Sequence, residues 1–250
     1  MHTRETQIKD DRLQTQIEDP FIKDDLLQME RAENYNKWLF DLVRPWIGKN
    51  VLEIGSGTGN FTGHILRIAS RVIAVEPNEY CSSVLASRYW NNQNVLIVKK
   101  SIEAFNSEDE DLSAVDTAVS INVFEHLVDD ISTLRKLRER LPRGSKIILL
   151  VPACPEVYGP IDKSVGHFRR YSKKSLFELN VDAGLTIKKL FYSNFPGLLG
   201  WWLNSRLSKR TRQNDSQIEV FNRLVPVIAG IEKVTGCAIG LSLISIAEIQ

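Results

Sequence analysis

The stretch VLEIGSGTGNFT, residues 51–62, places three glycines at alternate positions directly behind a short apolar run. Glycine adopts positive φ angles at no steric cost and lets a ligand touch the main chain. The apolar run predicts a buried strand, and a helical pattern resumes near Asn60, so the glycines join a strand to a helix. The first N–H groups of such a helix point toward whatever binds the turn. This order of elements predicts a nucleotide site.

Strands and helices alternate along the rest of the chain. Strands that are apolar throughout are typical of a parallel sheet covered by helices on both faces. We expect an α/β fold, a doubly wound and mostly parallel seven-stranded sheet, with a mainly helical insertion before the last strand. The predicted strands are 50–54, 71–76, 94–100, 115–122, 146–152, 185–192 and 241–249.

The domain organisation follows from length and polarity. A chain of 250 residues is most simply one domain. Residues 1–28 are polar, and we expect them to be loosely ordered. The remaining residues, 29–250, form a single domain in which two segments, 153–172 and 194–238, are candidate lid elements.

Composition excludes several classes of function. A net charge of +1 gives no broad basic field, so nucleic acid is not indicated as a partner. The N-terminus lacks the apolar core of a signal peptide, and no run approaches the roughly 18 apolar residues of a membrane-spanning helix. The three cysteines, Cys81, Cys154 and Cys237, match neither a metal motif nor a disulfide framework. We expect a cytoplasmic protein.

The aromatic and basic segment 195–212 has two interpretations. It could be a helix that rests on a membrane surface, or a helix that covers an apolar core or an acceptor pocket. The second interpretation is favoured.

Two carboxylates narrow the choice of nucleotide. Glu76 ends the second predicted strand, where a carboxylate can accept hydrogen bonds from ribose hydroxyls. The third glycine of a dinucleotide fingerprint would fall at Asn60, so the glycine spacing differs from that of dinucleotide binders. Glu53 lies near the end of the first strand, where it would repel a pyrophosphate and attract a cationic cofactor. S-adenosylmethionine carries such positive charge.

Three motifs together, VLEIGSGTGNFT, VIAVEPN and SINVFEHLVDD, resemble those of the class I S-adenosylmethionine-dependent methyltransferases. The resemblance implies that the glycine turn holds the methionyl part of the cofactor and that Glu76 binds its ribose. Ser101 stands where the family commonly has an aspartate near the adenine, with the apolar Ile102 beside it. The predicted cofactor-binding residues are Tyr35, Glu53, Gly55, Ser56, Gly57, Gly59, Asn60, Phe61, Glu76, Pro77, Ser101, Ile102 and Asn122.

The residues expected to bind the methyl acceptor and to activate it follow the fourth and fifth predicted strands. A hydroxyl acceptor needs a general base near neutral pKa, which favours histidine. His167 is the first candidate, followed by His126 and then Tyr171. An arginine of the 153–172 segment could clamp an anionic group, or the same polar residues could brace the loop. The predicted acceptor-binding residues are Tyr158, Asp162, Arg169, Arg170 and Trp201.

Acidic residues around His126 could suggest a metal, but a solvated helix start is the favoured interpretation, and we expect no metal.

The segment VPACPEVYGPIDKSVGHFRRYSKKSL resembles a bacterial methyltransferase subgroup associated with glycan, lipid or secondary-metabolite synthesis. These features predict methyl transfer to a small molecule, at oxygen first and at nitrogen or carbon as alternatives. The acceptor would be lipidic, polyketide-like or glycan-linked. Two other classes stay open, an NAD-dependent oxidoreductase and a non-catalytic cofactor-binding protein.

Overall fold

The structure is a computed structural model that describes residues 31–203, apart from residue 107, and residues 215–250. The segment 1–28 and the part of the insertion at 204–214 lie outside the described residues. The predictions of a loosely ordered N-terminus and of a membrane contact beyond residue 203 therefore stay predictions.

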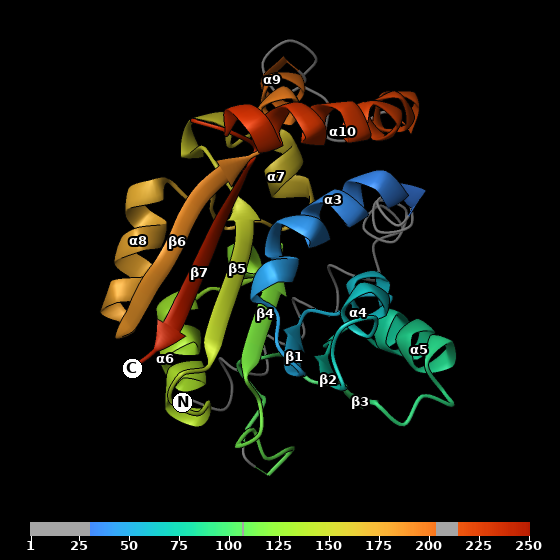
Figure 1. Cartoon of the computed structure of the whole chain (residues 1–250), viewed down its shortest axis with the longest axis vertical. Helices are drawn as coiled ribbons and strands as arrows, with labels where there is room; N and C mark the ends of the chain where they lie inside the picture. The colour runs from blue at the N-terminus through green and yellow to red at the C-terminus, as the bar shows by residue number, and fades with distance from the viewer. Residues whose placement is uncertain (1–30, 107, 204–214) are drawn as a thin grey trace.

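A seven-stranded sheet forms the centre of the molecule, with strand order β3-β2-β1-β4-β5-β7-β6 (Figure 1). The first five strands in sequence pair in parallel, and β7 is antiparallel to both of its neighbours. This arrangement confirms the predicted fold. The strands are β1 (Asn50–Ile54), β2 (Arg71–Val75), β3 (Val95–Val98), β4 (Thr117–Ile121), β5 (Lys146–Pro152), β6 (Leu185–Ser193) and β7 (Ser242–Ile249).

Helices cover both faces of the sheet, because alternate residues of each strand point to opposite sides. Leu52 of β1 packs in one apolar cluster with Leu134 and Leu176, whereas Val51 packs in the other with Leu39. The helices are α3 (Glu33–Val43), α4 (Asn60–Ile65), α5 (Glu79–Arg88), α6 (Asp130–Arg140), α7 (Pro160–Ser164), α8 (Lys173–Asp182), α9 (Phe195–Leu203) and α10 (Asp215–Thr235); short 3₁₀ turns are η1 (Arg44–Trp46), η2 (Phe124–His126) and η3 (Pro155–Val157).

Polar side chains fix where three of these helices begin. Asn78 accepts from the backbone N–H of Cys81, and Asp129 accepts from that of Ser132. Ser172 caps α8 in the same way. Each cap satisfies an N–H that the first turn of a helix leaves unpaired.

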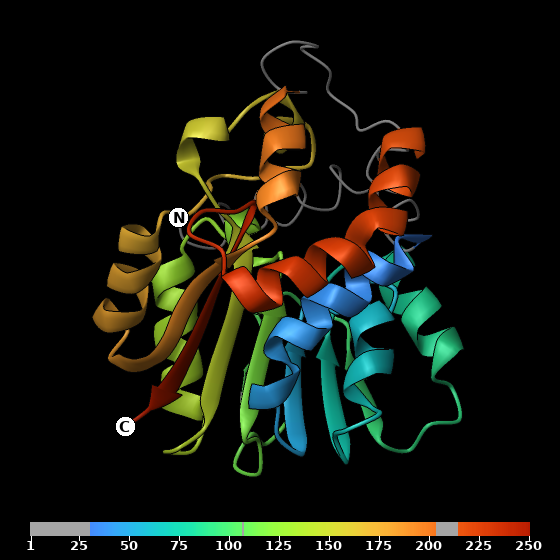
Figure 2. The same ribbon diagram turned by 45° about the horizontal axis from the view of Figure 1, so that its top comes forward.

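The insertion between β6 and β7 lies over the carboxyl ends of the parallel strands, and α10 runs beside α3 (Figure 2). Asn222 of α10 accepts from the backbone N–H of Tyr35 at 3.0 Å. The insertion leaves and re-enters the sheet at one place, since the N–H of Leu241 donates to the carbonyl of Asn194 at 2.9 Å. Within residues 31–203 and 215–250, no helix combines the length and the apolar character that crossing a bilayer requires.

Candidate active site

The three glycines of the turn after β1 all have positive φ, but they serve different purposes. A Cβ on Gly55 would approach Val123 to 2.3 Å, and one on Gly59 would approach Leu85 to 2.6 Å. These two glycines allow close packing. A Cβ on Gly57 would meet nothing within 4 Å, although its φ is +54°. Gly57 is therefore the position at which the backbone faces open space that a ligand can fill.

Glu76 ties this turn to the end of β2. Its two carboxylate oxygens accept the backbone N–H of Gly57 at 2.8 Å and of Asn78 at 2.9 Å. Burial raises the pKa of Glu76, and the two N–H donors partly oppose that effect. The carboxylate both shapes the turn and lines the space beside it.

Glu53 lies behind the turn rather than in the space in front of it. Its side chain is buried, and Thr62 of α4 donates its hydroxyl to it at 2.6 Å. Burial raises the pKa of Glu53 to about 7, a shift that the hydrogen bond from Thr62 moderates. Any effect of its charge on a ligand is exerted through the turn.

A cavity of about 1030 Å³ opens in front of the glycine turn. It is bounded by the carboxyl ends of β1, β2, β4 and β5, by α3 and by the insertion. Eleven of the thirteen predicted cofactor residues line it, and Glu53 and Gly59 do not. The residues that line it are Tyr35, Gly55, Ser56, Gly57, Asn60, Phe61, Glu76, Pro77, Ser101, Ile102 and Asn122.

Two of these residues have unusual surroundings. Asn122, at the end of β4, holds a left-handed conformation with φ +53°, which is a strained backbone for a residue other than glycine. Tyr35 is buried, and its hydroxyl lies near Ser242 and Asn194; burial raises its pKa, and these two neighbours partly oppose that effect. Tyr35 therefore connects α3 with both ends of the insertion.

Asp162 is the hub of the loop after β5. It accepts from the N–H of Gly159, from Nδ1 of His167 at 2.9 Å and from Nε of Arg170 at 2.7 Å. Burial alone would raise the pKa of Asp162, but the hydrogen bond from His167 and the charge of Arg170 lower it. The carboxylate stays ionised and holds the His167 ring so that Nε2 is free to act on another group.

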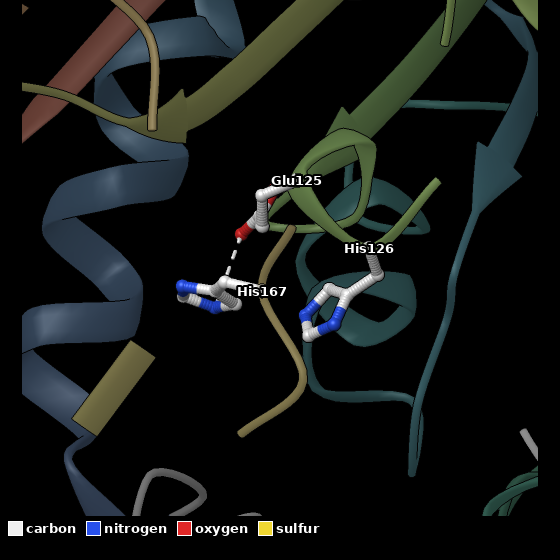
Figure 3. A group of neighbouring side chains, drawn as sticks. All are labelled: Glu125, His126 and His167. Carbon is white, nitrogen blue, oxygen red and sulfur yellow. Dashed lines mark ion pairs between the residues drawn. The ribbon is translucent and has the colours of Figure 1, made fainter. Parts of the chain in front are cut away.

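Glu125, His126 and His167 lie together at the cavity wall (Figure 3). The two imidazole rings meet edge to face at 4.8 Å. Burial, and then the neighbouring His167, lower the pKa of His126 to about 3, so this ring is neutral at physiological pH. Burial raises the pKa of Glu125 to about 8.

The other acceptor candidates divide into two groups. Arg170 and Trp201 line the cavity, with the guanidinium carbon 4.5 Å from the centre of the indole ring. Tyr158 donates to the carbonyl of His167, and Arg169 donates to the carbonyl of Val128 and pairs with Asp130, so both brace the loop.

Tyr171 also faces away from the cavity. Its hydroxyl lies 2.7 Å from Oδ2 of Asp130 and 3.1 Å from the carbonyl of Phe124. Burial raises the pKa of this tyrosine strongly, and the charge of Asp130 adds to the effect. Tyr171 therefore does not line the cavity, whereas the other two predicted catalytic residues, His126 and His167, do.

Sequence reasoning undervalued Glu125. The interpretation of the acids near His126 as a solvated helix start holds for Asp129, which is exposed and caps α6. It is wrong for Glu125, whose side chain is fully buried, and for Asp130, which is buried and bonded to the hydroxyl of Tyr171. A single carboxylate between Phe124 and His126 was the available signal. The segment 194–238 was predicted as a candidate lid, but the sequence did not indicate which of its residues, such as Asn194 and Phe221, line the cavity.

The residues around the glycine turn fit S-adenosylmethionine. Gly57 leaves open space, Glu76 offers carboxylate lone pairs beside it, and apolar and polar groups face the same cavity. Ser101 offers a hydroxyl where an acid is more usual.

Comparison with known proteins agrees with this fit. A family model described as a methyltransferase domain matches residues 21–190. A methyltransferase of Thermotoga maritima, described as a possible histamine N-methyltransferase, superposes with a TM-score of 0.59 at 19% identity, covering 87% of this chain and 91% of that one. A geranyl diphosphate methyltransferase superposes with a TM-score of 0.61 at 13% identity, covering 87% and 85%.

Curated relatives match over shorter stretches. An uncharacterized methyltransferase of Bacillus mycoides is 30% identical over 133 residues, 52% of this chain and 59% of that protein. A tRNA U34 carboxymethyltransferase of Alteromonas mediterranea is 30% identical over 124 residues, 45% of this chain and 36% of that protein. The matches thus span between about one third and three fifths of these relatives.

Fold and site together define a class I S-adenosylmethionine-dependent methyltransferase fold. The chain belongs to the family of methyltransferase domains.

Proposed function

We propose that the protein transfers a methyl group from S-adenosylmethionine to an oxygen of a small, largely apolar molecule. The observation that carries the proposal is one continuous cavity lined at one end by the glycine turn and at the other by the histidines and the insertion. When bound, the cofactor supplies an electrophilic methyl group on a sulfonium. The cavity volume, about 1030 Å³, is at the upper end of the roughly 300–1000 Å³ of single-ligand pockets, which suits a cofactor and an acceptor together.

The insertion supports an apolar acceptor. It contributes Leu203, Ile218, Phe221 and Leu224 to the cavity wall, beside the indole of Trp201. Apolar and aromatic walls with few polar groups are typical of small-molecule sites. A lipidic, polyketide-like or lipid-linked glycan acceptor has the chemistry that these walls suit.

His167 supports oxygen as the target atom. Methyl transfer to a hydroxyl requires its ionisation, whereas a neutral amine already has a free lone pair. Asp162 fixes Nδ1 of His167, which leaves Nε2 to promote that ionisation. His126 is held neutral and lies against the His167 ring, so it serves the same centre.

A nucleic-acid acceptor, as in the name of the Alteromonas relative, is disfavoured. The net charge of +1 lacks the cationic surface that phosphate backbones require. We also propose a cytoplasmic location, because the three cysteines form no disulfide with one another.

The test is methyl transfer from labelled S-adenosylmethionine to a host extract, with the product identified by mass spectrometry. His167→Ala should keep the affinity for S-adenosylhomocysteine and lower turnover by about 10²–10⁴-fold. His64→Gln is the matched control, because His64 stacks on Phe40 outside the cavity. A methylated amine as the sole product, or unchanged turnover in His167→Ala, would overturn the assignment to oxygen.

A further inference from the structure

The Glu125 carboxyl group is buried without a hydrogen bond to another described residue, and its one ion pair there is with His167 at 3.8 Å. Its side chain has 0% relative exposure. The nearby Arg170 directs its donors to Asp162 and to the carbonyl of Ala153 instead. An isolated buried carboxylate is costly, and buried charges are normally paired or bind metals. A cation bound beside Glu125 would favour its ionised form and compensate its charge.

Two imidazoles face the same point. Nε2 of His167 lies 3.8 Å from Oε1 of Glu125, which is too far for a hydrogen bond. A metal with bonds of roughly 2.0–2.2 Å to nitrogen and oxygen spans such a separation. Ligand atoms of Glu125, His126 and His167 all lie within 4.8 Å of one another, so small side-chain rotations bring them to one ion (Figure 3).

The far edge of the His167 ring is already anchored. Nδ1 of His167 is hydrogen-bonded to the Asp162 carboxylate at 2.9 Å, and the carbonyl of Gly166 lies near the His126 ring. Histidines that ligate metals almost always donate their second nitrogen to a carboxylate or a carbonyl, which fixes the ring and the tautomer. The bond from Asp162 fixes His167 as it would fix a metal ligand, and it would orient a general base in the same way.

We propose that Glu125, His126 and His167 bind a divalent first-row transition metal ion, such as Zn²⁺, at the acceptor end of the cavity. Two nitrogens and one carboxylate suit such an ion, whereas Mg²⁺ and Ca²⁺ prefer oxygen ligands. The remaining coordination positions face the cavity that all three residues line.

The role of the ion rests on the proposed function. A hydroxyl bound to the ion loses its proton to water more readily, because the metal stabilises the resulting oxyanion. His167 then promotes ionisation by holding the metal rather than by accepting the proton itself. The site itself can be measured without any acceptor.

The experiment is a calorimetric titration of the full, chelator-treated chain with Zn²⁺, and with Co²⁺ followed by its visible absorption. We expect saturable binding of one ion per chain and a Co²⁺ spectrum of a low-coordinate nitrogen site. Glu125→Gln and His167→Ala should each weaken binding at least about tenfold. His64→Gln should bind the ion as the unmodified chain does.

Affinity for S-adenosylhomocysteine shows whether each variant is folded. Absence of saturable binding by the unmodified chain, or equal binding by Glu125→Gln, His167→Ala and the unmodified chain, would overturn the metal site. Methyl transfer that persists at full rate in the chelator-treated chain would overturn the role of the ion and leave the proposed function intact. Metal binding without methylation of any acceptor would count against the proposed function alone.

Discussion

Replacing Gly57 and Gly55 separately by alanine tests whether the turn holds a cofactor. Both residues have positive φ, +54° and +71°, so each alanine costs about 1–2 kcal/mol of folding stability. At Gly55 the new Cβ also lies 2.3 Å from Cγ2 of Val123, and such overpacking adds about 1–3 kcal/mol. At Gly57 the Cβ enters open space, so the strain of the backbone is the whole stability cost.

Gly55→Ala should cost more stability than Gly57→Ala, but Gly57→Ala should cost more affinity for the cofactor. The Cβ of Gly57→Ala occupies the space in which the cofactor would contact the backbone, so we expect at least about a tenfold loss of affinity for S-adenosylhomocysteine, about 1.4 kcal/mol. Urea denaturation without ligand gives the stability of each variant, and calorimetric titration gives the affinity. A Gly57→Ala protein that binds S-adenosylhomocysteine as tightly as the unmodified chain would refute the assignment of this turn to the cofactor.

Three further predictions address the buried polar groups. Burial raises the folded pKa of Glu53 from 4.5 to about 7, so its contribution to stability is fully present below pH 4.5 and is lost as the pH rises through 7. Between pH 4.5 and 8 the free energy of unfolding, measured in urea, should therefore fall by about 3 kcal/mol more for the unmodified chain than for Glu53→Gln. The same pH dependence of this free energy in both proteins would contradict the prediction. Glu76→Ala should weaken binding of S-adenosylhomocysteine by about 1–3 kcal/mol in calorimetry, and unaltered affinity would exclude a ribose contact. Tyr171→Phe should lower stability by about 1–2 kcal/mol, through loss of its bond to Asp130, and leave turnover unchanged; a large loss of turnover in a folded variant would restore Tyr171 as a catalytic candidate.

The sheet could be predicted because its strands are short, apolar and separated by helices. The glycine turn and Glu76 were predictable for a similar reason, because each follows directly after such a strand. The different roles of the three glycines, close packing at Gly55 and Gly59 and open space at Gly57, could not be predicted. They depend on Val123 and Leu85, which come from other elements and fill the space beside Gly55 and Gly59.

The acceptor end was only partly predictable. The many polar residues of the loop after β5 indicate a functional site. The sequence does not show which of them face the cavity and which stabilise the loop. Asp162 accepts from three groups of its own loop, and of the loop's polar residues His167 and Arg170 line the cavity. Glu125 could not be assigned, because its burial depends on the loop folding over η2, where the N–H of Phe168 donates to the carbonyl of Glu125.

The backbone hydrogen bond between Leu241 and Asn194 holds the two ends of the insertion together, so that the insertion can be exchanged as one unit. Because its two ends meet where β6 ends and β7 begins, the entropy of closing the loop grows only slowly with the number of residues between them. A helical segment of different length or polarity could be grafted between these two positions, and the register of the sheet would not have to change. The half of the molecule that handles the nucleoside could then be retained while the choice of acceptor is redesigned.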